Sequence, residues 1–277
     1  MNVIKRIVSG VLGGGAVFAI LYAGSRFDIE WIVGILILII AYPAGIEYLQ
    51  LMKKIGIPVA QLEFLIWIPL LIFGYVVLEG RYGNVVLFLA ISYQVLRYLG
   101  ELPHRTGFMQ AIAGVFGLLY IPWLLSFFYL IYSSLGVSYT LVLLLMVWGY
   151  DTGAYALGSL IGRHQAFPYV SPGKSWEGVA GGFVMTVVGA LLGSFIALAW
   201  EPAAFWIGFP HILGLSLIVG MAVQLGDVFE SKLKRAAGEK DSGTFLPGHG
   251  GTLDRIDGLL FALPVFFFYY HHILRLM

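Results

Sequence analysis

Residues 139–161, YTLVLLLMVWGYDTGAYALGSLI, carry one charged side chain, Asp151, in a run of otherwise apolar, small or uncharged residues. About 20 such residues in a helix cross the hydrocarbon core of a bilayer. Comparable runs recur from one end of the chain to the other, without the alternation that β-barrel strands show. The sequence therefore predicts an all-α, polytopic integral membrane protein.

The composition supports a membrane protein. The 277 residues are 60% hydrophobic and only 11% charged, whereas an average soluble domain carries about 25% charged residues. The absence of cysteine excludes disulfides, thiolate catalysis and cysteine-bound zinc. The net charge of +1 does not by itself indicate a type of binding partner. We do not expect the protein to bind nucleic acid.

Hydropathy predicts about nine transmembrane helices. They cover residues 7–24, 31–52, 62–79, 84–100, 108–134, 139–161, 177–200, 210–230 and 258–275. The fifth is long for one span and contains Ile121-Pro122-Trp123, so it is either a kinked helix or two shorter pieces.

The loop charges favour nine spans with a cytoplasmic N-terminus. In that topology thirteen basic residues face one side: Lys5, Arg6, Lys53, Lys54, Arg97, Arg105, Arg163, Lys174, Lys232, Lys234, Arg235, Lys240 and Arg255. Three face the other: Arg26, Arg81 and Arg275. Lys and Arg concentrate in cytoplasmic loops. We therefore expect a multi-pass protein of the inner (plasma) membrane whose active site faces the cytoplasm.

Polar residues are distributed unevenly along the chain. Residues 1–135 have short loops and scattered charges, and we interpret them as a transmembrane scaffold. Residues 136–277 are interpreted as the catalytic region. They include the polar segment 231–257, SKLKRAAGEKDSGTFLPGHGGTLDRID. Its mixture of acids, bases and glycines suits a polyphosphate bound to a divalent cation.

Asp151 is a carboxylate within a predicted span. A charge at membrane depth costs a few kcal/mol on insertion scales and usually lines a polar cavity. Tyr155 follows four residues later and lies on the same helix face. The alternative is a residue that pairs two helices through a hydrogen bond.

Residues 171–178, SPGKSWEG, precede the seventh predicted span. A Pro-Gly turn with Lys174, Ser171 and Ser175 beside a helix N-terminus is suited to binding phosphate. Pro168 stands where a Walker A loop needs its first glycine, which excludes a P-loop. The alternative is a capped turn with a lysine directed to the interface.

Asp227 and Glu230 end the eighth predicted span, one helical turn apart. Two carboxylates at that spacing can share a cation. The alternative is a solvated helix end, although acids are disfavoured near a helix C-terminus.

Asp254 and Asp257 open the last predicted span and share a helix face, although one of them could serve only as a cap. Asp227 and Asp254 come from different spans, and a helix bundle builds interior metal sites in this way. Oxygen ligands without an imidazole or thiolate cluster favour Mg²⁺ over zinc.

His249 lies in the turn Pro247-Gly248-His249-Gly250-Gly251, whose glycines permit positive φ and close ligand approach. It could bind a phosphate or transfer a proton, or it could be a solvated loop histidine.

These motifs resemble those of the phosphatidate cytidylyltransferase family, also called CDP-diacylglycerol synthase. The family signature runs Ser-x-apolar-Lys-Arg, four residues, Lys-Asp, then Pro-x-His-Gly-Gly and Asp-Arg-apolar-Asp. The matching residues are Ser231, Leu233, Lys234, Arg235, Lys240, Asp241, Gly243, Leu246, Pro247, His249, Gly250, Gly251, Asp254, Arg255, Ile256 and Asp257. Thr252 departs from the aliphatic residue that the family usually has. The segments that begin at Asp151, Ser171 and Gly226 are similar to further family motifs.

The resemblance implies that CTP and phosphatidate give CDP-diacylglycerol and pyrophosphate, with Mg²⁺, potassium as a second cation, and homodimers. We expect Asp227 and Asp254 to hold Mg²⁺, with Asp257 or Asp151 as a further ligand. The candidate catalytic residues are Asp227, Asp254, Lys240, Arg255 and His249. The candidate substrate-binding residues are Ser171, Lys174, Ser175, Lys234, Arg235, Asp241, Gly250 and Gly251.

Two other functions remain open at this stage. A CTP-dependent lipid kinase needs similar metal and phosphate groups but transfers the γ-phosphoryl group. An ion-coupled transporter also carries intramembrane acids, but it predicts inverted repeats with acids in both halves.

Overall fold

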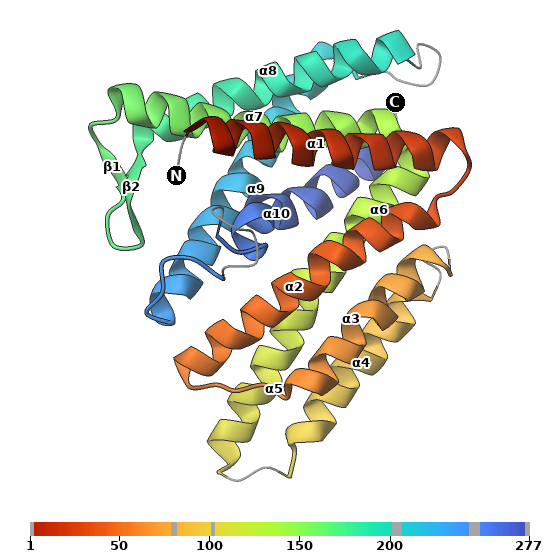
Figure 1. The fold of residues 1–277 in the computed structure, drawn as a ribbon, viewed down its shortest axis with the longest axis vertical. Coiled ribbons are helices and arrows are strands. Elements are labelled where there is room, and N and C mark those ends of the chain that lie inside the picture. Colours follow the sequence, from red (N-terminus) through yellow and green to blue (C-terminus); the bar gives the residue numbers. More distant parts are fainter. Residues whose placement is uncertain (1–2, 79–81, 101–102, 201–206, 244–249, 275–277) are drawn as a thin grey trace. The chain divides into compact units, whose positions relative to one another are not determined.

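A computed structural model describes residues 3–78, 82–100, 103–200, 207–243 and 250–274 of the chain. The fold has two compact units. The first comprises Met1–Leu130 and Ala236–Arg255, and the second comprises Ile131–Arg235 and Ile256–Met277. Figure 1 shows that helices dominate throughout, which confirms the all-α class.

Helices account for nearly all of the regular structure. They are α1 (Val3–Arg26), α2 (Trp31–Ile55), α3 (Gln61–Val76), α4 (Gly83–Tyr98), α5 (His104–Leu118), α6 (Leu124–Leu135), α7 (Val137–Ile161), α8 (Trp176–Trp200), α9 (Phe209–Ala236) and α10 (Leu253–Tyr269). Two π-helical turns, η1 (Leu119–Trp123) and η2 (Tyr270–Leu274), follow α5 and α10. The strands β1 (Gln165–Phe167) and β2 (Ser171–Ser175) form an antiparallel hairpin.

A helix coincides with each of the nine predicted spans. Six of the described helical segments are long and apolar enough to cross a membrane. They are Trp31–Ile55, His104–Leu135, Val137–Ile161, Trp176–Ala199, Phe209–Ala236 and Leu253–Leu274. The membrane-embedded class is thus supported, while nine crossings and a cytoplasmic N-terminus stay predictions.

The fifth predicted span is one continuous helical element, His104–Leu135. Pro122 lies in the π-helical turn η1 between α5 and α6. Proline lacks the N–H that an α-helix needs, and a π-turn accommodates that loss without ending the helix. Of the two alternatives, the structure favours a single element with a local irregularity.

Two boundaries differ from prediction. Helix α9 continues to Ala236, so Asp227 and Glu230 lie inside the helix and not at its end. Hydropathy predicted the end of the apolar run at residue 230, whereas the helix itself continues through polar residues. Residues 171–175, expected as a turn, form strand β2 and pair with β1.

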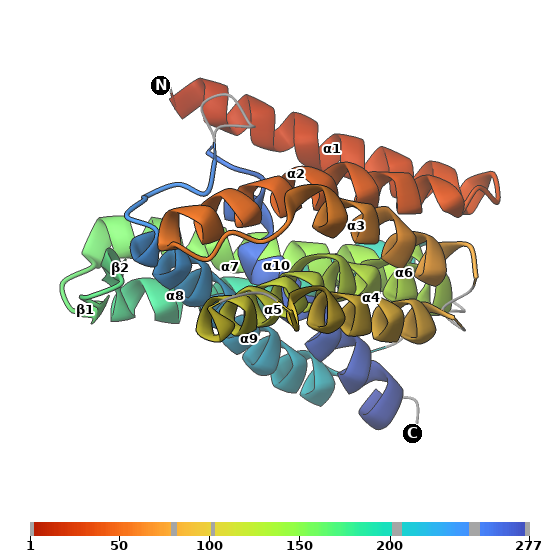
Figure 2. The same ribbon diagram turned by 90° about the horizontal axis from the view of Figure 1, so that it is seen from below.

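In the first unit, helices α2, α3, α4 and α5 run alongside one another (Figures 1 and 2). Tyr48 of α2 is fully buried and stacks on Phe64 of α3. Its hydroxyl donates to the carbonyl oxygen of Ala113 at 2.7 Å. The phenol therefore buries its ring while its polar group keeps a partner.

In the second unit, α7 and α8 pack closely, and the β hairpin protrudes where they join (Figure 1). Small residues permit this approach. A Cβ at Gly153 would lie 2.3 Å from the carbonyl oxygen of Gly181, and one at Gly189 would lie 2.2 Å from that of Leu145. Close backbone contact at glycines is a common way for helices to associate in membranes.

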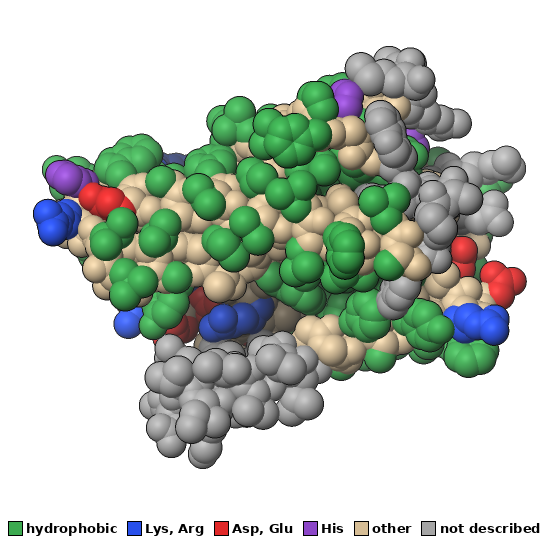
Figure 3. All heavy atoms as spheres, turned by 90° about the horizontal axis from the view of Figure 1, so that it is seen from above, with side chains coloured by type: hydrophobic (Ala, Val, Ile, Leu, Met, Phe, Trp, Pro, Cys, Tyr) green, Lys and Arg blue, Asp and Glu red, His purple; other side chains and the backbone are tan. Residues whose placement is uncertain are grey.

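Large apolar side chains are exposed along several helices. Phe88 of α4 is 68% exposed and Phe195 of α8 is 73% exposed. Figure 3 shows apolar side chains spread over the visible helices, with charged side chains in a few small patches. Apolar exposure on this scale is unfavourable in water and suits contact with lipid.

Candidate active site

Two ion pairs gather around α9 in the second unit. Lys174 of β2 pairs with Asp227, and Lys234 pairs with Glu230 one turn earlier on the same helix. The Glu230 side chain is fully buried. Burying a carboxylate is costly unless a cation lies against it, and Lys234 supplies that cation.

Asp257 of α10 joins these acids because α9 and α10 approach closely at Gly226. A Cβ at Gly226 would lie 2.2 Å from the carbonyl oxygen of Asp257. The carboxylate of Asp257 interacts electrostatically with Asp227, Glu230 and Asp151. We call Asp151, Asp227, Glu230 and Asp257 the acidic cluster.

Asp151 reaches the acidic cluster from α7, one residue after the buried Tyr150. The hydroxyl of Tyr150 donates to Oε1 of Gln224 on α9 at 2.8 Å. This bond ties the two helices together at the level of the cluster. The role of Asp151 as a further metal ligand stays a prediction.

The β hairpin brings Lys174 to α9. Nε of Arg235 donates to the carbonyl oxygen of Val170 at 3.3 Å, which links the hairpin to the end of α9. Ser175 is buried, and its Oγ accepts a hydrogen bond from the N–H of Gly178 at 3.1 Å. Ser175 thus caps α8, while Ser171 lies at the start of β2.

The acidic cluster has the chemistry of a hard-cation site. Its donors are all carboxylate oxygens, the ligands that Mg²⁺ prefers. In the described part of the chain, no three acids or histidines lie close enough together to hold a metal ion, and Lys174 and Lys234 pair with two of the acids. The type of donor matches the preference of Mg²⁺ for carboxylate oxygens, and a bound Mg²⁺ stays a prediction.

Asp254 belongs to the first unit and organises the polar segment. Its Oδ2 accepts hydrogen bonds from the N–H of Ser242 at 2.9 Å, the Oγ of Ser242 at 2.9 Å and the N–H of Gly251 at 2.8 Å. Asp227 lies in the second unit. The convergence of Asp227 and Asp254 on one cation stays a prediction.

The remaining predicted residues lie in the same segment. Lys240, Asp241 and Arg255 are exposed. Gly250 has φ +82°, a left-handed conformation that glycine adopts without strain. His249 falls outside the residues that the structure describes, so its role stays a prediction.

Glu47 is a polar residue that we did not predict. It lies on α2, is only 4% exposed, and accepts hydrogen bonds from Ser242, Thr252 and Leu253. The signal in the sequence was a lone carboxylate inside the apolar run 31–52, which is costly without a partner.

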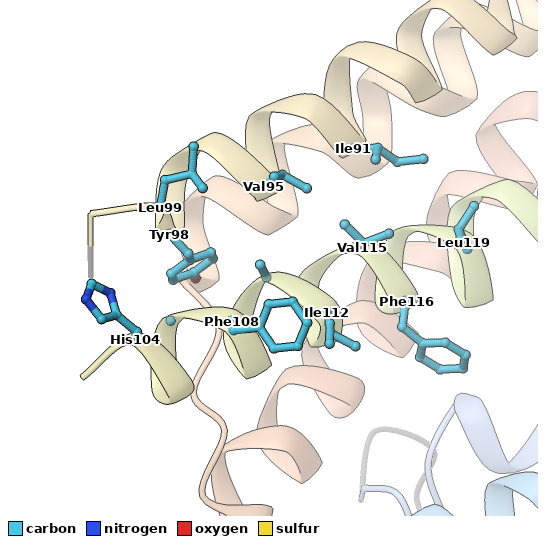
Figure 4. Close-up of a pocket in the computed structure, with 12 residues that line it drawn as sticks. Ile91, Val95, Tyr98, Leu99, His104, Phe108, Ile112, Val115, Phe116 and Leu119 are labelled. Atoms are coloured by element: carbon cyan, nitrogen blue, oxygen red, sulfur yellow. The ribbon is translucent and has the colours of Figure 1, made fainter. Parts of the chain in front are cut away.

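A separate hollow of about 640 Å³ lies between α4 and α5 in the first unit (Figure 4). The described residues around it are almost all apolar, and among them only Tyr98 and His104 carry polar side-chain atoms. This lining has no cation for a triphosphate and no carboxylate for a metal. It therefore does not suit the chemistry indicated by the acidic cluster.

Comparisons with known proteins identify the family. A model of the cytidylyltransferase family matches residues 4–273. Over 178 residues the chain is 40% identical to a phosphatidate cytidylyltransferase of Staphylococcus aureus (strain COL), covering 64% of this chain and 65% of the relative. It is 38% identical, with the same coverage, to a phosphatidate cytidylyltransferase of Staphylococcus saprophyticus. The family match extends over almost the whole sequence, and the chain belongs to the cytidylyltransferase family.

Proposed function

We propose that this protein transfers the cytidylyl group of CTP to phosphatidate, giving CDP-diacylglycerol and pyrophosphate for phospholipid biosynthesis. The observation that carries the proposal is the acidic cluster with its two lysines, assembled from α7, β2, α9 and α10 in a chain of this family. Carboxylates for a cation and ammonium groups for phosphates are what a nucleotide triphosphate requires.

The reaction is an in-line substitution at the α-phosphorus of CTP. A phosphate oxygen of phosphatidate forms a new bond to that phosphorus. The bond from the phosphorus to the β-phosphate bridging oxygen breaks, and pyrophosphate leaves with the electron pair. A phosphomonoester is already anionic near neutral pH, since its second pKa is about 6. The protein therefore needs no strong general base, and its task is to position charges.

Each group of residues has a part in this chemistry. The carboxylates of Asp227, Asp257 and Asp151, together with Asp254, would hold Mg²⁺, which neutralises phosphate charge when bound. Lys174, paired with Asp227 in this structure, would move onto a phosphate oxygen. The departing pyrophosphate would be stabilised by four basic side chains of the polar segment: Lys234, Arg235, Lys240 and Arg255.

The distribution of charges along the sequence indicates on which side of the membrane the reaction takes place. The excess of basic loop residues on one side supports an active site on the cytoplasmic face of the plasma membrane, where CTP is available. Phosphatidate would keep its acyl chains in the bilayer and enter laterally between helices. Homodimers and a potassium ion remain part of the proposal on the strength of the family resemblance.

Activity of the purified protein tests the proposal. With CTP, phosphatidate and Mg²⁺, we expect CDP-diacylglycerol and pyrophosphate by mass spectrometry. Asp227→Asn should lower turnover at least about 100-fold, since it removes a charge from the reacting site. Glu63→Gln, which alters an acid paired with Arg97 outside the acidic cluster, should retain activity. Full activity of Asp227→Asn would contradict the proposed site.

A further inference from the structure

Glu47 forms hydrogen bonds with both ends of the segment 242–253, which lies within the family signature. Its Oε2 accepts a hydrogen bond from Oγ of Ser242 at 3.0 Å, before the loop. Its Oε1 and Oε2 accept hydrogen bonds from the N–H groups of Thr252 and Leu253, both at 2.8 Å, after the loop. One buried carboxylate from α2 therefore fixes both ends of residues 242–253.

The contacts at Thr252 and Leu253 cap helix α10, which begins at Leu253. The first N–H groups of a helix have no partner within it, and a negative charge beside them is favourable. The hydroxyl of Thr252 is buried without a hydrogen-bond partner, so it does not provide the cap. Glu47 provides it from another helix.

Two glycines of the polar segment leave space for Glu47. A Cβ at Gly243 would lie 2.7 Å from Oε1 of Glu47, and a Cβ at Gly251 would lie 2.5 Å from its Oε2. Neither distance is compatible with a side chain while the carboxylate is in place. The absence of a side chain at Gly243 and Gly251 therefore allows the carboxylate of Glu47 to approach the backbone of the polar segment.

Glu47 reaches Asp254 through Ser242. Oγ of Ser242 lies 3.0 Å from Oε2 of Glu47 and 2.9 Å from Oδ2 of Asp254. A hydroxyl has one proton to donate, so the two carboxylates share this contact. The Ser242 hydroxyl thus links Asp254 to Glu47, beside the hydrogen bonds that Asp254 accepts from the N–H groups of Ser242 and Gly251.

We propose that Glu47 is a positioning residue for the reaction, acting through Ser242 and the start of α10 to hold Asp254 in its working orientation. The inference rests on the proposed function, because Asp254 matters to catalysis only if the chain carries out the cytidylyl transfer. It assigns an essential part of the site to α2, a helix of the predicted scaffold.

Glu47→Gln tests the inference, because glutamine keeps the size of the side chain and replaces one acceptor oxygen with a donor. Hydrogen exchange in detergent, without substrate, should become at least about tenfold faster at Thr252 and Leu253. In the assay kcat should fall about 10- to 100-fold, as expected for a misplaced group. Glu63→Gln is the matched control and should change neither quantity. Wild-type exchange and wild-type kcat in Glu47→Gln would overturn the inference.

Ser242→Ala provides a second, independent test, and it decides the question if Glu47→Gln does not fold. It removes the hydroxyl that links Glu47 to Asp254 but leaves the N–H of residue 242 and the cap on α10. We therefore expect kcat to fall while exchange at Leu253 stays as in the wild type. In the double variant the losses in log kcat should be less than additive, and additive losses would contradict a shared path. If the wild type itself makes no CDP-diacylglycerol, the proposed function fails, and the exchange data still decide whether Glu47 fixes the loop.

Discussion

Lys174 on strand β2 pairs with Asp227 on helix α9, although 53 positions separate them in the sequence. The pair joins the hairpin after α7 to Asp227 of the acidic cluster. In a site for a metal-bound nucleotide, each partner has a second use: the carboxylate for the cation and the ammonium group for phosphate.

Replacing Lys174 should weaken nucleotide binding. We expect Lys174→Met to raise the KM for CTP about tenfold, since a hydrogen bond to a charged group contributes about 1.5 to 3 kcal/mol. Steady-state kinetics with CTP as the varied substrate provides the measurement. Lys232→Met, at an exposed position on the same helix as Asp227, is the control. A change in thermal stability alone would make Lys174 a structural residue.

Asp257→Asn should raise the thermal stability of the protein and lower its activity. The carboxylate of Asp257 lies among three other acids, so neutralising it relieves like-charge repulsion. We expect a higher Tm together with a loss of turnover of about 100-fold. Thermal unfolding in detergent and the activity assay provide the two values. A lower Tm would show that this carboxylate stabilises the fold.

Gly226→Ala should separate α9 from α10, because the added Cβ would meet the backbone of Asp257 at 2.2 Å. Overpacking of this kind costs about 1 to 3 kcal/mol, and we expect a lower Tm. Gly173→Ala is the matched control in the same unit, since nothing lies within 4 Å of the added Cβ there. Equal Tm values for the two variants would contradict the close approach at Gly226.

Ser175→Ala tests whether this serine caps a helix or binds substrate. Loss of the hydrogen bond to Gly178 should cost about 1 kcal/mol of stability. If Ser175 only caps α8, the KM for CTP and for phosphatidate should stay as in the wild type. A raised KM at unchanged Tm would support the predicted substrate-binding role instead.

The sequence predicted the positions of the helices well because long apolar runs leave a chain few alternatives in a bilayer. It was less accurate at α9, where Lys232, Lys234 and Arg235 continue the helix to Ala236. Hydropathy detects the edge of the apolar region, which is not the end of the hydrogen-bonded helix. The β1–β2 hairpin was not predicted, because Pro172 and Gly173 are typical turn residues but lie within the five-residue strand β2.

The sequence singled out candidate site residues but not the contacts between them. Asp151 stood out because an acid within a membrane span is costly, and Asp227 and Asp257 stood out by their helical spacing to Glu230 and Asp254. In the second unit, Asp257 interacts electrostatically with Asp151 and Asp227. The pairing of Lys174 with Asp227 depends on tertiary packing, which spacing along the chain does not encode. Glu47 was missed because its partners, Ser242, Thr252 and Leu253, lie about 200 positions away.

The fate of the α-phosphorus of CTP tests the proposed reaction most directly. The purified protein is supplied with phosphatidate, Mg²⁺ and CTP labelled with ³²P at either the α- or the γ-position. We expect the α-label in the lipid fraction and the γ-label in pyrophosphate. Gamma-label in the lipid would indicate a CTP-dependent kinase, and a lipid fraction that acquires neither label would contradict nucleotide transfer altogether.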